Sequence, residues 1–159
     1  MSFNHFDAKG QAVMVDVSGK SATMRTAVAR ATVTMKPATL AAILAGKMTK
    51  GDVLAVARLA GIAAAKKTPD LIPLSHPLAI HHAAIEFSPD PDSGVVTVEA
   101  TVRAFERTGV EMEAMTAASV AALTIYDMCK GTEKGIVIGG LCLQYKEGGK
   151  SGTYRREEP

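Results

Sequence analysis

The stretch from Glu111 to Lys130 constrains the fold of this chain more than any other. It consists mostly of good helix formers without proline, and Gly131 follows where a helix can end. Thr108 and Glu111 form the T-x-x-E capping pattern that marks a helix start. The middle of the stretch is apolar almost all the way round, so the helix must be covered on two sides. We therefore expect a sheet on one side and another subunit or domain on the other.

The charges of this helix gather at its two ends. Glu111 and Glu113 stand at the beginning, and Asp127 and Lys130, three residues apart, share one face near the end. In one interpretation, Glu111 is a capping partner, and Asp127 and Lys130 form an ordinary surface pair. In the other, a buried helix carries charge only where something charged meets it. The helix alone leaves both interpretations open.

Composition excludes several classes of protein. The chain has 159 residues, 47% of them hydrophobic and 21% charged, which predicts one soluble globular domain. A net charge of +2, 4% aromatic residues and no tryptophan argue against nucleic-acid binding. No signal-peptide pattern and no run of roughly 18 apolar residues is present. Cys129 and Cys142 are expected to be reduced thiols, so we predict a cytoplasmic protein without a membrane partner.

The other elements follow from periodicity and from turn residues. We expect strands at 27–36, 82–87, 95–105 and 135–146, and helices at 37–44 and from a T-x-x-D cap at Thr49 to Lys66 or Lys67. The order predicts an α+β fold with the βαββαβ plan: a ferredoxin-like antiparallel sheet covered by helices on one face, with an additional helix. Residues 1–25 and 150–159 are expected to be irregular or mobile. A second copy is expected to close the open face, so we predict an oligomer.

Histidines and lysines are the next candidates for chemistry. Lys50 stands where the free N–H groups of a helix start favour an anion. His76 lies in the proline-bounded run LIPLSHP, and its ordinary pKa suits proton transfer near neutrality. Together with His81 and His82 it raises the idea of a metal, but the spacing matches no zinc pattern, so we predict no metal site. The tail EGGKSG lacks the first glycine of a Walker loop, which excludes such a nucleotide site.

The polar residues in constrained surroundings combine cations, one histidine and carboxylates. Cations neutralise a polyphosphate, whereas carboxylates and histidine carry protons. The mixture suggests rearrangement of a phosphorylated small molecule. Its members are Arg25, Lys50, His76, Glu111, Glu113, Asp127, Lys130, Lys146 and Lys150.

Five segments of the chain resemble a known family. LIPLSHP, KGDVLAVARLAGIAAAKKT, TGVEMEAMTAASVAALTIYDMCK, GGKSG and MVDVS are similar to segments of the molybdenum-cofactor biosynthesis protein C (MoaC) family, the cyclic pyranopterin monophosphate synthases. The resemblance runs from about Asp7 to Gly152. It implies a lyase that converts 3′,8-cyclo-7,8-dihydroguanosine 5′-triphosphate into cyclic pyranopterin monophosphate and diphosphate. It also implies a homohexamer, a trimer of dimers, with sites at the dimer interface.

The resemblance also assigns roles to residues. Asp127 matches the catalytic aspartate, and we assign Lys50, Lys130 and His76 to proton transfers and ring opening beside it. Two segments match substrate-binding positions, Leu74–His76 with Ser75 at its centre and Met112–Glu113. Glu111 falls on a further site position, and three cations are expected to hold the triphosphate: Arg25, Lys146 and Lys150.

Two residues depart from the family pattern. Ser75 replaces the usual cysteine, and Glu147 replaces the usual serine, placing a negative charge next to Lys146 that is expected to weaken phosphate contact. No cofactor is required as far as the sequence shows, although Mg²⁺ can accompany the triphosphate. The alternative is a non-catalytic ferredoxin-like domain that binds a phosphorylated effector. A Ser75/His76 hydrolase is disfavoured because adjacent residues of a strand face opposite ways.

Overall fold

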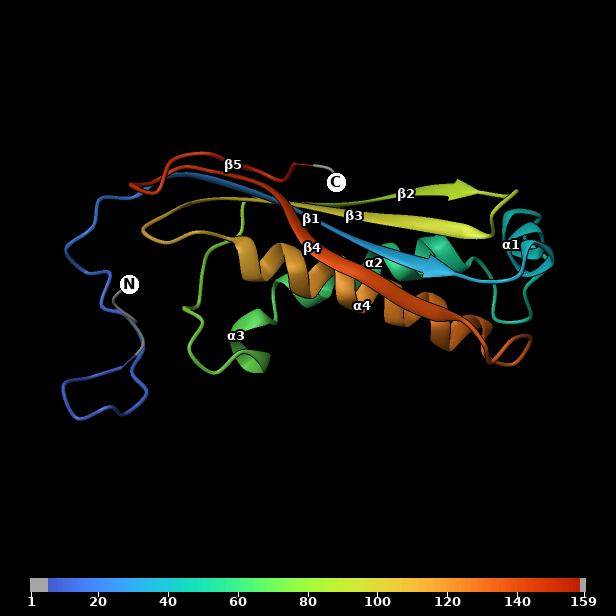
Figure 1. Ribbon diagram of the computed structural model, residues 1–159, viewed down its shortest axis with the longest axis horizontal. Coiled ribbons are helices and arrows are strands. Elements are labelled where there is room, and N and C mark those ends of the chain that lie inside the picture. The colour runs from blue at the N-terminus through green and yellow to red at the C-terminus, as the bar shows by residue number, and fades with distance from the viewer. Residues whose placement is uncertain (1–5, 158–159) are drawn as a thin grey trace.

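The computed structural model describes residues 6–157 and shows a five-stranded sheet packed against helices (Figure 1). The elements are β1 (Thr23–Thr34), α1 (Pro37–Leu44), α2 (Val53–Ala65), α3 (Thr68–Leu71), β2 (His82–Asp90), β3 (Val95–Glu106), α4 (Glu111–Cys129), β4 (Val137–Glu147) and β5 (Tyr154–Arg155). The strand order is β2-β3-β1-β4-β5, and every neighbouring pair is antiparallel. The predicted α+β class with an antiparallel sheet is confirmed. Within residues 6–157, none of the helices combines the length and the apolar character that a membrane span requires.

The sheet has one face buried by helices and one face that carries polar side chains. α2 and α4 lie side by side against the buried face (Figure 1). The alternation predicted for β3 is confirmed, since alternate residues of β3 and of its partner β1 are fully buried. These residues are Ala27, Ala29, Ala31, Val33, Val96, Val98, Ala100, Val102 and Ala104. On the other face, Arg30 and Glu99 form an ion pair at 3.4 Å.

Helix α4 is covered on two sides, but the second cover comes largely from the same chain. Its small residues, Ala114, Ala117, Ala118, Ala121 and Ala122, have no exposed surface. α2 approaches closely at Gly61, where a Cβ atom would lie 3.0 Å from the carbonyl oxygen of Ala117. The expectation that another subunit or domain covers this helix is therefore wrong for the part that packs on α2. Met112 and Leu123 remain exposed, at 39% and 57%.

Both predicted capping residues are wrong. The N-cap of α4 is Val110, without a side-chain hydrogen bond, so Thr108 lies before the helix. The N-cap of α2 is Asp52, whose carboxylate accepts from the backbone N–H of Ala55 at 3.0 Å. Gly51 adopts a φ of 91°, which no helical residue has, so α2 cannot begin at Thr49.

The chain ends are more regular than expected. β1 already begins at Thr23, which pairs with Glu106 of β3. β5 extends the sheet by pairing with Tyr145 and Lys146 of β4. The expectation of irregular structure is therefore wrong for these two stretches. The outermost residues of the two stretches that were expected to be irregular, 1–5 and 158–159, lie outside the described residues.

Candidate functional site

A basic cavity of about 800 Å³ opens where β1 and β4 meet the turn before α4. Five cationic residues line it: Lys20, Arg25, Arg107, Lys146 and Lys150. Among the described lining residues, Glu111 is the single carboxylate. The first turn of α4 adds free backbone N–H groups and the positive end of the helix dipole. This cavity, called the basic cavity below, suits a ligand with several negative charges.

Arg25 lines the basic cavity and also builds it. Its side chain donates from Nε to the carbonyl oxygen of Glu106 at 3.1 Å and from Nη2 to that of Arg107 at 3.2 Å. The residue is only 9% exposed. Two of its donor groups therefore hold the turn before α4, and the predicted grip on a triphosphate must come from the rest of the guanidinium group.

Lys146 is directed into the same cavity by the register of the sheet. It pairs with Ala27, whose side chain lies on the helix-covered face. Its Nζ lies 3.7 Å from Oε1 of Glu111 and donates to the hydroxyl of Ser151. Lys146 is thus held by groups that a more negative ligand can replace.

A second cavity of about 400 Å³ adjoins the first and is less basic. It lies between the first turns of α4, the segment 74–78 and the N-terminal residues Val15 and Val17. Lys20, Thr108, Gly109 and Glu111 line both cavities. The structure thus gathers every predicted substrate-binding residue around this pair of cavities: Arg25, Leu74, Ser75, His76, Glu111, Met112, Glu113, Lys146 and Lys150.

His76 is fixed by a hydrogen bond to the backbone of the N-terminal segment. Its Nε2 lies 2.7 Å from the carbonyl oxygen of Val15. A carbonyl oxygen only accepts, so Nε2 carries the proton and Nδ1 is the ring nitrogen that can accept one. Ser75 and His76 line the same cavity, because segment 74–78 is not a strand. The argument from opposite faces of a strand therefore does not apply, although the engaged Nε2 still disfavours a hydrolase pair.

Glu113 is the buried carboxyl group of the second cavity. It is only 2% exposed, and burial raises its pKa from 4.5 to about 7, with repulsion from Glu111 adding to the effect. A carboxyl group with such a pKa exchanges protons near neutral pH. The sequence predicted a substrate-binding role for Glu113 but not this capacity for proton transfer. The signal was available, because Glu113 is the one charged residue between Met112 and Tyr126 of the helix.

Asp127 lies at the opposite end of α4 and is gripped by two lysines. Lys130 Nζ lies 2.6 Å from Oδ1 and Lys50 Nζ lies 3.1 Å from Oδ2, while Lys50 also donates to the carbonyl oxygen of Asp127 at 2.9 Å. Hydrogen bonds from Lys130 first, and Lys50 second, hold the pKa of the Asp127 carboxyl below its usual value. The structure thus brings these three predicted site residues together, and they are called the aspartate cluster below.

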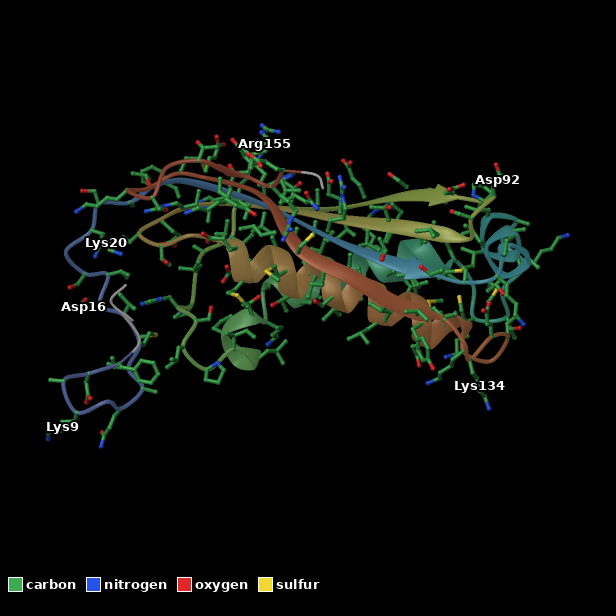
Figure 2. All side chains as sticks on the ribbon, in the orientation of Figure 1. Lys9, Asp16, Lys20, Asp92, Lys134 and Arg155 are labelled. Atoms are coloured by element: carbon green, nitrogen blue, oxygen red, sulfur yellow. The ribbon has the colours of Figure 1, made fainter. Side chains whose placement is uncertain are left out.

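The aspartate cluster and the two cavities do not meet within one chain. Asp127 follows Glu111 by 16 residues, which corresponds to about 24 Å along an α-helix. Figure 2 labels Lys20, which lines both cavities, at one end of the molecule. It labels Lys134, which follows Lys130 of the aspartate cluster by four residues, at the other end. Within one chain His76 therefore lies far from Asp127, so the predicted association of the two residues can arise only between two copies of the chain.

Sequence reasoning missed two cations of the basic cavity. Lys20 lines both cavities, and Arg107 donates from Nη1 to the carbonyl oxygen of Ser18 at 2.9 Å. Neither residue belongs to a segment with helical or strand periodicity, so periodicity does not reveal them. Lys20 lies two residues after the end of the MVDVS segment, which was the available signal.

The two departures from the family pattern lie in different places. Ser75 lines the second cavity beside His76, as expected. Glu147 accepts a hydrogen bond from the Tyr145 hydroxyl at 2.6 Å and pairs with Thr26. Adjacent strand residues face opposite ways, so Glu147 lies on the polar face of the sheet and not in the cavity with Lys146. Glu147 is therefore not among the lining residues of the basic cavity, and the expected weakening of phosphate contact has no direct contact behind it.

Gly149 offers a test of how the basic cavity is built. A Cβ atom there would lie 1.8 Å from Nη1 of Arg25, and its φ is 73°. Gly149→Ala should lower the free energy of unfolding by about 1–3 kcal/mol through the strain of a non-glycine residue at positive φ, and further because it displaces the guanidinium group. The matched control is Gly152→Ala, which has a similar φ of 65° but no atom within 4 Å. Urea unfolding and binding of inorganic triphosphate should separate the two variants, and equal losses would contradict the contact with Arg25.

The fold and the cavities define an α+β protein with a basic pocket, suited to an anionic small molecule, at the start of a buried helix. Residues 14–149 match the model of the MoaC family, and the chain belongs to this family. A cyclic pyranopterin monophosphate synthase of Geobacter metallireducens is 76% identical over 159 residues, which cover 100% of this chain and 99% of that protein. A protein with the same name from Trichlorobacter lovleyi is 68% identical, over 99% of this chain and 99% of that protein. Another from Chloroflexus aggregans is 57% identical, over 98% of this chain and 94% of that protein.

Proposed function

We propose that this protein is a cyclic pyranopterin monophosphate synthase, a lyase of molybdenum cofactor biosynthesis. It rearranges 3′,8-cyclo-7,8-dihydroguanosine 5′-triphosphate into cyclic pyranopterin monophosphate and releases diphosphate. The observation that carries the proposal is the pair of adjoining cavities at the start of α4, one basic and one containing His76 and Glu113. Identities of 57% to 76% to proteins of this name, over nearly the whole chain, support the same reaction.

The two cavities divide the substrate by its chemistry. The cations of the basic cavity neutralise the triphosphate, and the second cavity takes the purine-derived ring system beside His76 and Glu113. The α-phosphate then lies at the junction, where Lys20 lines both cavities. Cyclisation needs this phosphate close to a sugar hydroxyl, and cations stabilise the charge that grows on the departing diphosphate.

The complete site requires a second copy of the chain. Asp127, Lys50 and Lys130 are assigned to proton transfer and ring opening, yet they lie at the far end of α4 from the cavities. A dimer in which each subunit presents its aspartate cluster to the cavities of the other unites both parts. We assign the protein to a homohexamer, a trimer of such dimers. The strand order β2-β3-β1-β4 supports the ferredoxin-like layout of each subunit.

The proposal also covers the role of Mg²⁺ and the cellular compartment. Mg²⁺ belongs with the triphosphate of the substrate rather than with the protein, because Glu111 is the single carboxylate among the described residues of the basic cavity. The protein acts in the cytoplasm, and the free thiols of Cys129 and Cys142 support a reducing compartment.

The direct test supplies the purified protein with the cyclised GTP derivative. Diphosphate and the pterin product should form in equal amounts. The reaction is run once with and once without a chelator of Mg²⁺, which shows whether turnover depends on this ion. Tight binding of the substrate without either product would instead favour a non-catalytic domain for a phosphorylated effector.

A further inference from the structure

One carboxylate ties the segment after α4 to the start of α1. Glu133 accepts from the Thr39 hydroxyl at 2.7 Å and from the backbone N–H of Lys36 at 3.0 and 3.3 Å. Lys36 is the N-cap of α1, and no side-chain cap hydrogen bond comes from it. The free N–H groups and the dipole at a helix start favour a carboxylate, so Glu133 serves as the cap from 97 residues away.

On the α4 side, this tie reaches the aspartate cluster through the backbone. The N–H groups of Thr132 and Glu133 donate to the carbonyl oxygen of Cys129 at 2.8 and 3.0 Å. The Tyr126 hydroxyl donates to the carbonyl oxygen of Lys134 at 3.4 Å. The segment that carries Glu133 is thus closed onto the last turn of α4, directly after Lys130.

The other end of this connection, helix α1, is joined to Lys50 by the chain that follows the helix. The segment 45–52 leaves α1 and carries Lys50, while Met48 within it is anchored in the core at 9% exposure. Lys50 reaches Asp127 from this segment and Lys130 reaches it from the end of α4. The packing of α2 on α4 fixes one end of the segment that carries Lys50, and the bonds of Glu133 to the start of α1 constrain the other end.

We propose that Glu133 is a positioning residue of the aspartate cluster, which joins α1 to the end of α4 and so keeps Lys50 and Lys130 on Asp127. Glu133 contacts none of the three side chains, so it acts through the two backbone segments. The consequence for turnover rests on the proposed function, whereas the consequence for geometry does not.

The test measures the pKa of the Asp127 carboxyl by NMR titration in Glu133→Gln and Glu133→Ala, without substrate. Removing a nearby negative charge by itself lowers this pKa, because the Asp127 carboxylate is repelled less. Loosened contacts with Lys130 and Lys50 raise it toward the ordinary 3.8, because these contacts hold it down. The two causes thus act with opposite sign, and we expect a rise. Thr39→Val should give a smaller rise without any change of charge, and Glu86→Gln, an exposed carboxylate on β2, should give none.

Kinetics provide the second readout. We expect kcat of Glu133→Ala to fall about 10-fold while KM changes less than about 2-fold, because the cations that hold the triphosphate are not displaced. An unchanged or lowered pKa of Asp127 in both Glu133 variants overturns the proposal and leaves Glu133 as a helix cap only. If instead the pKa rises but the wild-type protein binds the cyclised GTP derivative without forming product, the proposed function is wrong and the positioning role stands.

Discussion

Subunits that carry Asp127→Asn, mixed with subunits that carry His76→Ala, should recover a turnover that neither variant has alone. Within one chain, Asp127 and the cavity that contains His76 lie at opposite ends of α4, about 24 Å apart at about 1.5 Å per residue. In the proposed dimer, each site takes its aspartate cluster from one subunit and its cavities from the other. A mixed dimer then contains one site with both replacements and one site with neither.

The expected size of the recovery follows from this arrangement. Loss of a proton-transferring group lowers activity about 10²–10⁴-fold, so each variant alone should be nearly inactive. With random assembly of equal amounts, about half of the dimers are mixed and one site of each is intact, which gives about a quarter of wild-type activity. Co-expression of the two variants measures this value in the unfractionated mixture, and purification of the mixed species with two affinity tags should raise the activity toward about half of wild type.

The matched control mixes Asp127→Asn with Lys50→Ala. Both replacements affect the same cluster, in which Lys50 Nζ lies 3.1 Å from Asp127 Oδ2. Each site of the mixed dimer then holds one damaged cluster, so no recovery is expected. If the mixture of Asp127→Asn with His76→Ala recovers no turnover, or if the control mixture recovers as much, a site shared between subunits is contradicted.

The fold was predictable where periodicity alone decides it. The alternation in β3 identified its buried face, and the run of small residues in α4 identified a buried helix. Capping motifs were less informative, because a T-x-x-E pattern matches whether or not the threonine stands at the N-cap. The φ of 91° at Gly51 decides the start of α2, and the T-x-x-D pattern does not reveal it. β5 is only two residues long and has no pattern of its own.

The residues of the candidate site were predictable from the sequence. Their separation into two groups at opposite ends of α4 was not. The resemblance to the MoaC family named residues from segments distant in the sequence, and the structure places the predicted substrate-binding residues around the two cavities. The association of His76 with Asp127 was predicted for a dimer interface, and the length of α4 shows why one chain cannot provide it. A helix of 19 residues is about 28 Å long at about 1.5 Å per residue. Charges at its two ends therefore cannot meet without a second copy.

Glu113→Gln should make the protein more stable at pH 8 by about 3 kcal/mol and leave its stability at pH 4 unchanged. Burial raises the pKa of Glu113 from 4.5 to about 7, and each pKa unit corresponds to about 1.4 kcal/mol. Between these values the unfolded chain has lost the proton that the folded chain keeps. The free energy of unfolding therefore falls as the pH rises from about 4.5 to about 7, and stays lowered above it. Glutamine is uncharged at every pH and removes this dependence.

Urea unfolding of the wild type and the variant, at one protein concentration from pH 4 to pH 8, measures the difference. Glu111→Gln is the informative control, because it removes only the smaller contribution, the repulsion between the two carboxylates. It should leave most of the slope between pH 4.5 and pH 7 in place. Parallel curves for wild type and Glu113→Gln would mean that Lys20 and His76, which line the same cavity, already compensate the charge of Glu113. In that case Glu113 would be an ionised ligand of the substrate and not a carrier of protons at neutral pH.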